Sequence, residues 1–567
     1  MRFSSIHGWL IVTLSLVVSA PVIWLGVPDW GNDGIFHAQM TREYARQFWN
    51  GDLWPRWTAN TNAGFGSPTF YFLPVFSRLA VVWLDPLFAA WDPDGMYLTA
   101  VSLVLAMVLG ALATWRWCRD FSTSGGALFA AVIFTIQPYH LAVNLYTRAA
   151  LGELWGNVWP PLILLAQARM ASGGRLGFPA LALSYGLLVL NHLPTTVCFS
   201  LLVLLAPFLL QDRHQRMPVL FKTLAAMLLG MAISGTYLVP ALLDQNKVFI
   251  ELNVEGMFQH FKLLLFRTGP LLHSQMRLML LAIATLVFAA VCAWLAWRQE
   301  KDQLRRRQLL FLIWMTAYSV FFSSQLAAPF YEVLKPLQQL QFPTRFLQVL
   351  VVSSCGLAAI SWPHWIELWR GNKQKFPLAL AGGMVVLWLV ADLWGATMAF
   401  SRWRPFEEPR KKMWAMILTN KADSYVYLPR TAPVRSLDGY DKMTDFARQH
   451  PPKQIWARDR SGNRLTPPAL VSWQPREIRL RHGGQAGELV VNHFYYPQWK
   501  ARRTDTKAPL AIGPDDFGMI RITAPAGDYE IAIELESSPA ETMGDAATAI
   551  GLLAVGGLGL RGKRRAA

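Results

Sequence analysis

Charged residues are scarce in this chain: Asp, Glu, Lys and Arg make up only 16% of its 567 residues, while hydrophobic residues make up 53%. That balance excludes an intrinsically disordered protein, which combines few apolar residues with many charges. The four cysteines lie in or beside apolar segments, so we expect neither a disulfide framework nor a zinc site. The HExxH, CxxC, GxSxG and P-loop patterns are absent as well. Zinc proteases, dithiol redox enzymes, serine hydrolases and NTPases therefore lose their usual sequence support.

Long apolar runs, in contrast, are abundant. Windows of roughly 17–25 residues recur along the chain, and each can cross the hydrocarbon core of a bilayer, about 30 Å thick. We therefore predict a polytopic α-helical membrane protein with about twelve transmembrane helices. The predicted spans are 9–27, 96–115, 126–136, 154–167, 178–190, 197–210, 219–243, 278–297, 309–323, 346–362, 378–400 and 546–560. The first is predicted to be an uncleaved span, with a cleavable signal peptide as the alternative.

Basic residues alternate between the connections, and this alternation indicates the orientation. The formal net charge is +17, and clusters of Lys and Arg follow every second span. Because cytoplasmic loops of membrane proteins collect Lys and Arg, we predict that both termini are cytoplasmic, and we expect no nucleic-acid partner. The other connections, including a long first loop at 28–95, are then extracytoplasmic.

Composition divides the chain into three parts. Residues 1–400 form the multi-span module, and 546–567 form a final transmembrane helix and a basic cytoplasmic tail. The stretch between them, 401–545, is polar and rich in Pro and Gly, with alternating runs at 488–494 and 529–534. Alternation with a period of two, interrupted by turn residues, predicts strands. We expect a small extracytoplasmic domain there that is β-rich and sandwich-like.

Polar residues collect at the predicted extracytoplasmic ends of the spans, and Asp392 is the main acid inside one. Ionisable groups within a bilayer mark transport pathways, so their scarcity favours chemistry at one membrane face. Asp33 and His37 follow the first span and would lie one turn apart if a helix begins at Gly34. Asp33 could then be the general base towards an acceptor hydroxyl, while His37 binds phosphate. The alternatives are that Asp33 only caps that helix, or that Asp29 is the base.

Further candidates lie at the same predicted face. Arg148 could hold a phosphate through two nitrogens and Glu153 could be a second catalytic acid, unless the two form only a local ion pair. Arg345 stands at the mouth of a span, where it either contacts a ligand or only reaches the interface. The other substrate-binding candidates are Arg56, Tyr146 and His192. For His192, a lone histidine at a span end, a structural role is the safer interpretation.

Several loose motifs occur in a familiar order. They are Asp33 and His37, GDLWPRW at 51–57, NAGFGSPTFYFLP at 62–74, NLYTRAALGE at 144–153, NHLPT at 191–195, QFPTRFL at 341–347, VVNHFYYPQWKA at 490–501 and APAGDYEIAIEL at 524–535. In this order they resemble the GT-C superfamily of multi-span glycosyltransferases. The resemblance is to bacterial YfhO-like proteins and to membrane proteins related to 6-pyruvoyl-tetrahydropterin synthase. One departure is Thr344, where such proteins often carry Trp before the arginine.

The resemblance implies an inverting glycosyltransferase of the bacterial inner membrane, acting at the extracytoplasmic face. Its donor would be a sugar on a polyprenyl phosphate, and its acceptor an envelope lipid or glycan. Asp33 would activate the acceptor, while Arg148 and Arg345 would stabilise the departing lipid phosphate. Relatives differ in their use of a divalent cation, and this chain has too few clustered acids to require one.

Two other classes of function are alternatives. A lipid or glycan transporter, or a flippase, would need a polar seam at mid-bilayer, of which the sequence shows almost none. A non-catalytic envelope assembly protein with a GT-C-like fold would tolerate the loss of the Asp33 carboxylate, which an enzyme would not.

Overall fold

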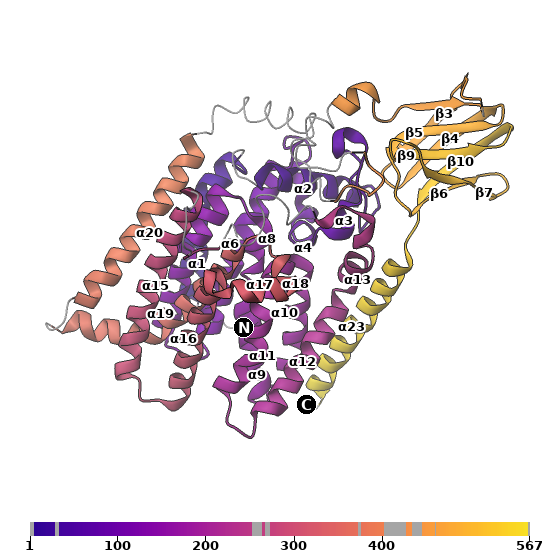
Figure 1. Cartoon of the computed structure of the whole chain (residues 1–567). Coiled ribbons are helices and arrows are strands. Elements are labelled where there is room, and N and C mark those ends of the chain that lie inside the picture. Colours follow the sequence, from indigo (N-terminus) through magenta and orange to yellow (C-terminus); the bar gives the residue numbers. More distant parts are fainter. Residues whose placement is uncertain are drawn as a thin grey trace.

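A helical bundle and a two-sheet β unit make up the structure. This computed structural model describes residues 5–28, 33–251, 264–266, 273–371, 376–401, 427–433, 445–459 and 461–564. The β unit, residues 455–535, stands beside one end of the bundle, which we call the β-unit end (Figure 1).

The apolar windows that were predicted to cross the membrane are largely helical, although those at 154–167 and 219–243 are each divided between two helices. Among the described residues, nine helical segments are long and apolar enough to do so: Ile6–Leu25, Met96–Cys118, Ser124–Thr147, Leu193–Leu210, Arg216–Ile233, Gln275–Gln299, Pro343–Arg370, Phe376–Ala399 and Pro539–Leu560. The other three windows fall on α9 (Trp159–Ala171), α10 (Gly177–Asn191) and α16 (Gln303–Ser323). The first two have only 13 and 15 residues, and α16 carries three arginines near its start, so the predicted count is approximate.

Burial separates the central helices from the peripheral ones. The nine segments named above lie mainly on α1 (Ser5–Leu25), α6 (Met96–Cys118), α7 (Ser124–Ile136), α11 (Leu193–Leu210), α12 (Arg216–Ile233), α15 (His273–Gln299), α19 (Leu347–Arg370), α20 (Phe376–Ser401) and α23 (Pro539–Arg564). The apolar window that contains α19 is 89% buried, and α19 packs against α7, α15 and α16. The window of α23 is only 11% buried, so most of this helix faces outward. A helix that is apolar all round suits either surrounding, a protein core or lipid.

The predicted span at 219–243 is broken into α12 and α13 (Gly235–Leu243) at Ser234. The second piece, α13, crosses α23 at two glycines. A Cβ on Gly235 would lie 2.7 Å from the carbonyl oxygen of Gly544, so only glycine permits this approach. Small residues at such crossings let transmembrane helices pack closely.

Helices, all but the first of them short, make up about half of the connection at 28–95, which was predicted as a loop. They are α2 (Gly34–Trp49), η1 (Asn62–Gly64), α3 (Thr69–Phe72), α4 (Phe76–Leu79), η2 (Val82–Leu84) and α5 (Asp85–Phe88). Their apolar side chains, among them Met40, Tyr44 and Phe70, form a small core of their own. We call this stretch the first connection.

Among the described residues, ten strands form two antiparallel sheets of five, which confirms the predicted β-rich region. The strands are β1 (Ile455–Arg458), β2 (Arg464–Leu465), β3 (Ala469–Gln474), β4 (Glu477–Gly484), β5 (Gly487–Phe494), β6 (Trp499–Arg503), β7 (Pro509–Leu510), β8 (Ile512–Pro514), β9 (Met519–Ala524) and β10 (Gly527–Leu535). Their orders are β2-β1-β5-β9-β8 and β3-β4-β10-β6-β7. Inward residues of both sheets, such as Ile522 and Ile531, share one core. Of the predicted domain, 402–426 and 434–444 lie outside the described residues.

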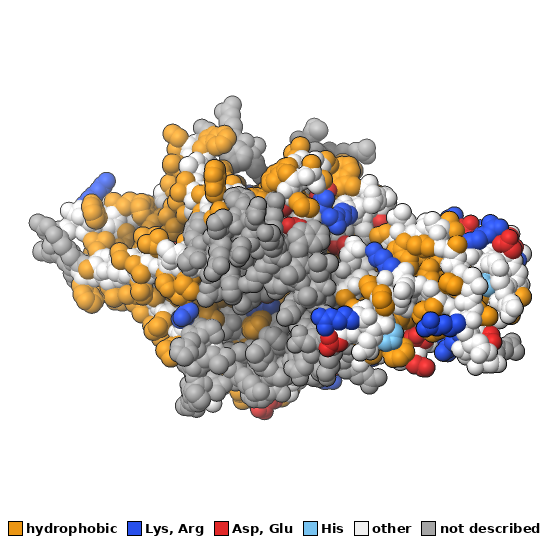
Figure 2. Space-filling model, turned by 90° about the horizontal axis from the view of Figure 1, so that it is seen from above, with side chains coloured by type: hydrophobic (Ala, Val, Ile, Leu, Met, Phe, Trp, Pro, Cys, Tyr) orange, Lys and Arg blue, Asp and Glu red, His pale blue; other side chains and the backbone are white. Residues whose placement is uncertain are grey.

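Side-chain type distinguishes the β unit from the bundle. Seen from the β-unit end, the β unit carries many charged side chains, whereas hydrophobic side chains gather on the helices opposite (Figure 2). Exposed apolar residues are expected where lipid surrounds a protein, and exposed charges where water does. This contrast agrees with a multi-pass membrane protein whose β unit lies outside the bilayer.

The last helix begins at Pro539, earlier than the predicted Ala546. Ser538 and Glu541 form a capping box: the Glu541 N–H donates to Ser538 Oγ at 3.1 Å, and the Ser538 N–H donates to Glu541 Oε2 at 2.9 Å. The Glu541 carboxylate also accepts hydrogen bonds from Arg56 Nε at 2.9 Å and the Tyr71 hydroxyl at 3.0 Å. The start of α23 is therefore fixed to the first connection.

Candidate active site

The first turn of α2 carries the Asp33 and His37 pair. Asp33 occupies the N-cap position but its side chain makes no capping hydrogen bond, so the capping interpretation is wrong. Its Oδ2 instead accepts from Arg148 Nη2 at 3.1 Å. The His37 N–H donates to the Asp33 carbonyl oxygen at 2.9 Å, which confirms the predicted one-turn spacing. A Cβ on Gly34 would lie 2.7 Å from the Pro28 carbonyl oxygen, so only glycine lets α2 begin this close to the end of α1.

An irregular stretch of chain presents Arg148. After α7, the π-helix η3 (Tyr139–Thr147) leads to Arg148, whose N–H donates to the Val143 carbonyl oxygen at 2.9 Å. Ala149 follows with φ at 51°, in the left-handed region that a Cβ disfavours. Irregular turns of this kind concentrate at functional sites. This one brings Arg148 and the short helix α8 (Leu151–Gly156) to the start of α2.

Two carboxylates and two guanidinium groups form a continuous chain of ion pairs. Arg148 Nη1 donates to Glu153 Oε1 at 2.9 Å, and Arg345 Nε donates to the same oxygen at 3.0 Å. Arg345 lies on η8 (Pro343–Phe346), directly before α19. Tyr139 donates to the second Glu153 oxygen at 3.1 Å. We call Asp33, Arg148, Glu153 and Arg345 the ion-pair cluster; the structure brings these four together from distant parts of the sequence.

Accessibility separates the roles of the two carboxylates. The Asp33 side chain is 36% exposed, whereas that of Glu153 is 2% exposed. Burial alone would raise the pKa of Glu153, but Arg148 and Arg345 outweigh it and hold that pKa below its usual range. Glu153 is therefore an ionised counter-ion of two arginines. A second catalytic acid would need a proton and access to substrate, so the alternative interpretation, a local pair with Arg148, is the one that the structure supports.

His37 contacts a residue that the sequence analysis missed. Arg78, on α4, places Nη2 at 3.0 Å from His37 Nδ1. Because a guanidinium group only donates, Nδ1 accepts and the ring carries its proton on Nε2. Burial, together with Arg78 and Arg148, holds the pKa of His37 well below its usual value, so the ring is neutral. A lone arginine in the apolar run at 73–84 is the signal that could have identified Arg78, since arginine is almost never buried without a reason.

His192 has the structural role that was the safer interpretation. It precedes α11, where Nδ1 accepts from the Thr195 N–H at 3.3 Å. Its ring packs closely against Gly152 of α8. A Cβ at Gly152 would lie only 2.8 Å from His192 Cδ2. Burial is the main cause that lowers the pKa of His192 to about 3. Substrate binding by this residue stays a prediction.

Two predicted binding residues lie outside the ion-pair cluster. Arg56 is paired with Glu541, and the Tyr146 hydroxyl donates to the Val18 carbonyl oxygen, which ties η3 to α1. Asp392 is buried on α20, and its carboxylate oxygens make no hydrogen bond within the described residues. The alternative base Asp29 falls outside the described residues.

No group of three or more His, Cys, Asp or Glu that could hold a metal ion occurs within the part of the chain that the structure describes. Both acids of the ion-pair cluster are bound by Arg148. That no divalent cation is required stays a prediction.

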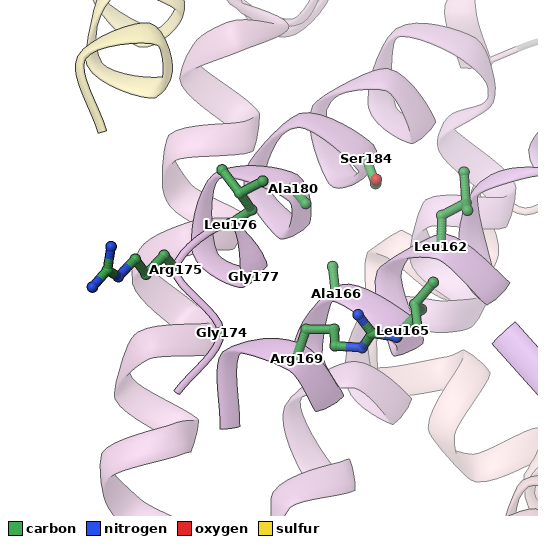
Figure 3. A pocket seen from close by; sticks show the side chains of 10 residues that line it. All are labelled: Leu162, Leu165, Ala166, Arg169, Gly174, Arg175, Leu176, Gly177, Ala180 and Ser184. Atoms are coloured by element: carbon green, nitrogen blue, oxygen red, sulfur yellow. The ribbon is translucent and has the colours of Figure 1, made fainter. Parts of the chain in front are cut away.

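A cavity of about 590 Å³ lies towards the other end of the bundle, between α9 and α10 (Figure 3). Its lining is mainly apolar, with Arg169 and Arg175 beside it and Ser184 further along. Arg169 is bound by Asp120, at 3.0 Å through Nε and 2.8 Å through Nη2. None of the residues that line this cavity belongs to the predicted site.

Comparison with known proteins gives the family. A family model described as the 6-pyruvoyl-tetrahydropterin synthase related domain, a membrane protein, matches residues 87–401, which is more than half of the chain. The chain belongs to this family. The matched range of this related-domain family contains Arg148, Glu153 and Arg345, whereas Asp33 and His37 precede it. No curated protein matches the sequence significantly.

Several solved structures are partly similar to this member of the family. The arabinofuranosyltransferase AftD from Mycobacteria is 16% identical with a TM-score of 0.44, over 72% of this chain and 27% of that one. The Archaeoglobus fulgidus oligosaccharyltransferase is 13% identical with a TM-score of 0.45, over 79% and 69%. ArnT from Cupriavidus metallidurans, solved with undecaprenyl phosphate bound, is 13% identical with a TM-score of 0.40, over 78% and 88%. The chain thus spans only about a quarter of AftD.

Proposed function

We propose that this protein is an inverting glycosyltransferase of the bacterial inner membrane. It transfers a sugar from a polyprenyl-phosphate donor to an envelope lipid or glycan. The observation that carries the proposal is the Asp33 carboxylate, which is partly exposed and is held by Arg148 instead of by the end of its own helix. The order of motifs that resembles GT-C enzymes supports the class of reaction.

Asp33 is the general base in this proposal. Arg148 fixes Oδ2, and Oδ1 makes no hydrogen bond among the described residues, so a carboxylate oxygen is left for substrate. The carboxylate takes the proton of an acceptor hydroxyl as its oxygen attacks the anomeric carbon. The bond between that carbon and the phosphate oxygen breaks, and the electron pair leaves with the lipid phosphate. Direct displacement inverts the configuration of the sugar.

Arg148 and Arg345 stabilise the negative charge that develops on the departing phosphate. Glu153 holds both guanidinium groups, and the Leu340 carbonyl oxygen also accepts from Arg345. The Phe342 ring lies 5.7 Å from the Arg148 guanidinium carbon and 5.1 Å from that of Arg345. Groups that are already oriented need no reorganisation during the reaction, which is how fixed charges lower a barrier.

Deletion of the gene tests the function directly. We expect mass spectrometry of envelope lipids and glycans to show the loss of one glycosylated species and the accumulation of a polyprenyl-phosphate sugar. Re-expression of the wild-type chain should restore both. An unchanged glycan profile would contradict a transferase, and accumulation of the donor on the cytoplasmic side alone would favour the flippase alternative.

The orientation has a test of its own. We expect a cysteine placed at the exposed Ser461 of the β unit to react with a membrane-impermeant reagent in intact cells. A cysteine at Ser172, which is exposed beyond the other end of α9, should react only after lysis. The four native cysteines are buried and should contribute little background. The reverse pattern would place the ion-pair cluster on the cytoplasmic side.

A further inference from the structure

The ion-pair cluster carries no net charge to offer a phosphate. Asp33 and Glu153 supply two negative charges, and Arg148 and Arg345 supply two positive ones. A phosphate monoester that leaves in the proposed transfer would add negative charge to a neutral group of residues. If the proposed function holds, another cation must lie beside the cluster.

Within the part of the chain that the structure describes, Arg78 is a buried cation without a carboxylate partner. It is only 2% exposed. Its Nη1 donates to the Pro74 carbonyl oxygen at 3.0 Å and its Nη2 donates to His37 Nδ1 at 3.0 Å. Its Nε is buried without a hydrogen-bond partner. Burial lowers the pKa of Arg78 to about 10, so it still carries its charge at neutral pH.

Other buried arginines of this protein have the carboxylate that Arg78 lacks. Arg56 is also 2% exposed and is paired with Glu541 at 2.9 Å, while Arg345 is paired with Glu153. No acid lies within ion-pairing distance of Arg78 among the described residues. A buried charge without a counter-ion is strongly destabilising. We therefore infer that Arg78 is retained for a ligand that supplies the opposite charge.

Arg78 also lies on the same side as the ion-pair cluster. Arg78 Nη2 contacts the ring of His37, the His37 N–H donates to the Asp33 carbonyl oxygen, and the Asp33 carboxylate accepts from Arg148. His37 experiences the charges of both Arg78 and Arg148. The tautomer that Arg78 imposes leaves the His37 Nε2–H as a further donor, and His37 is only partly buried.

We propose that the Nε2–H of His37, with the charge of Arg78 behind it on Nδ1, forms a binding subsite for a phosphoryl group, filled by the phosphate of the lipid-linked donor. Arg78 supplies the positive charge that the neutral ion-pair cluster lacks. Through its hydrogen bond to Nδ1 it also directs the proton of His37 towards the anion. The subsite binds phosphate before, during and after transfer, so it contributes to donor affinity.

Binding of farnesyl phosphate and of farnesol to the purified full-length protein in detergent tests the subsite. The measured quantity is the ratio of the two dissociation constants, because the prenyl chain is common to both ligands. We expect wild type to bind farnesyl phosphate more tightly than farnesol. In Arg78→Gln, the ratio of the two dissociation constants should shift at least tenfold towards farnesol. The shift in Arg78→Lys should be smaller. The matched control is Arg42→Gln in the same connection. The removed arginine is paired with Asp85, outside the ion-pair cluster, so the ratio of the two dissociation constants of the folded variant should stay within about twofold of wild type.

Each result decides between Arg78 as a ligand group and Arg78 as a packing group. An equal loss of affinity for both ligands in Arg78→Gln would overturn the subsite, as would a wild-type protein without preference for the phosphate. Inorganic phosphate that binds wild type as tightly as farnesyl phosphate would overturn the lipid-linked source in favour of the free anion. The two proposals can fail separately. If the purified protein prefers farnesyl phosphate in a way that depends on Arg78, but deletion of the gene leaves the glycans unchanged, the subsite is supported and the transferase is contradicted.

Discussion

Replacing Asp33 by Asn is expected to lower the rate of sugar transfer by about 10²- to 10⁴-fold, the usual contribution of a positioned base. The amide keeps the size of the side chain but cannot take a proton. Because Arg148 keeps its pair with Glu153 in the variant, we expect the ion-pair cluster to stay folded. The measurement is the rate of formation of the glycan that deletion of the gene identifies. Affinity for farnesyl phosphate, measured alongside, should not fall, because the variant removes a negative charge from the ion-pair cluster.

The control for Asp33→Asn is Asp85→Asn. Asp85 also binds an arginine, Arg42, at the same end of the bundle, but it lies outside the ion-pair cluster. Asp85 and Arg42 are largely buried, so this variant also loses stability, and transfer is therefore compared per amount of folded protein. On that basis we expect transfer by Asp85→Asn to stay within about threefold of wild type, because the pair lies outside the ion-pair cluster. Transfer by Asp33→Asn at a near-normal rate would exclude Asp33 as the base and leave Asp29 as the candidate.

The largest effect on stability is expected from Glu153→Gln. Two guanidinium groups, those of Arg148 and Arg345, would lose their common partner in a site that is almost inaccessible to water. Removing one member of a buried ion pair typically costs about 3–5 kcal/mol, because the remaining charge is left without compensation. The midpoint of SDS-driven unfolding of the purified protein should fall accordingly, and transfer should be lost as well, since both arginines would no longer be held in place.

Glu488→Gln is the matched control for that substitution. Glu488 accepts from Arg458 Nε at 2.9 Å on the β unit, but both side chains are about one third exposed. Solvent screens such a pair, so we expect a change of at most about 1 kcal/mol. Equal midpoints for Glu153→Gln and Glu488→Gln would show that Glu153 does not organise the two arginines.

The helices of the bundle could be predicted from the sequence because the requirement for about 20 apolar residues is local. Their ends depend on finer signals. The start of α23 was placed at Ala546, although Ser538 and Glu541 have the spacing of a capping box and lie where the helix begins. The break at Ser234 also has a signal that was not used, since Ser234 and Gly235 form a pair that interrupts the apolar run.

The site could be predicted only in part. Asp33, Arg148 and Arg345 were selected because polar residues at one predicted membrane face must share an environment, and they do lie together. The π-helix before Arg148 depends on packing against other helices and has no sequence pattern. The partner of Arg56 could not be predicted, because it lies 485 residues away. Arg78 was missed because its neighbours in the sequence are apolar. Those same neighbours bury its charge, and a buried charge is what makes the residue a candidate for ligand binding.

The pairing of Arg56 with Glu541 has a consequence for the biosynthesis of the protein. The two residues are separated by 485 positions, so a ribosome that adds about 5–20 residues per second makes Glu541 roughly 25–100 s after Arg56. Throughout that interval the first connection lacks the carboxylate that Arg56 and Tyr71 bind in the finished protein. Arg56 and Tyr71 therefore make their final contacts only after α23 has been synthesised. A nascent chain that stops short of α23 leaves the buried Arg56 without its carboxylate, which destabilises the first connection.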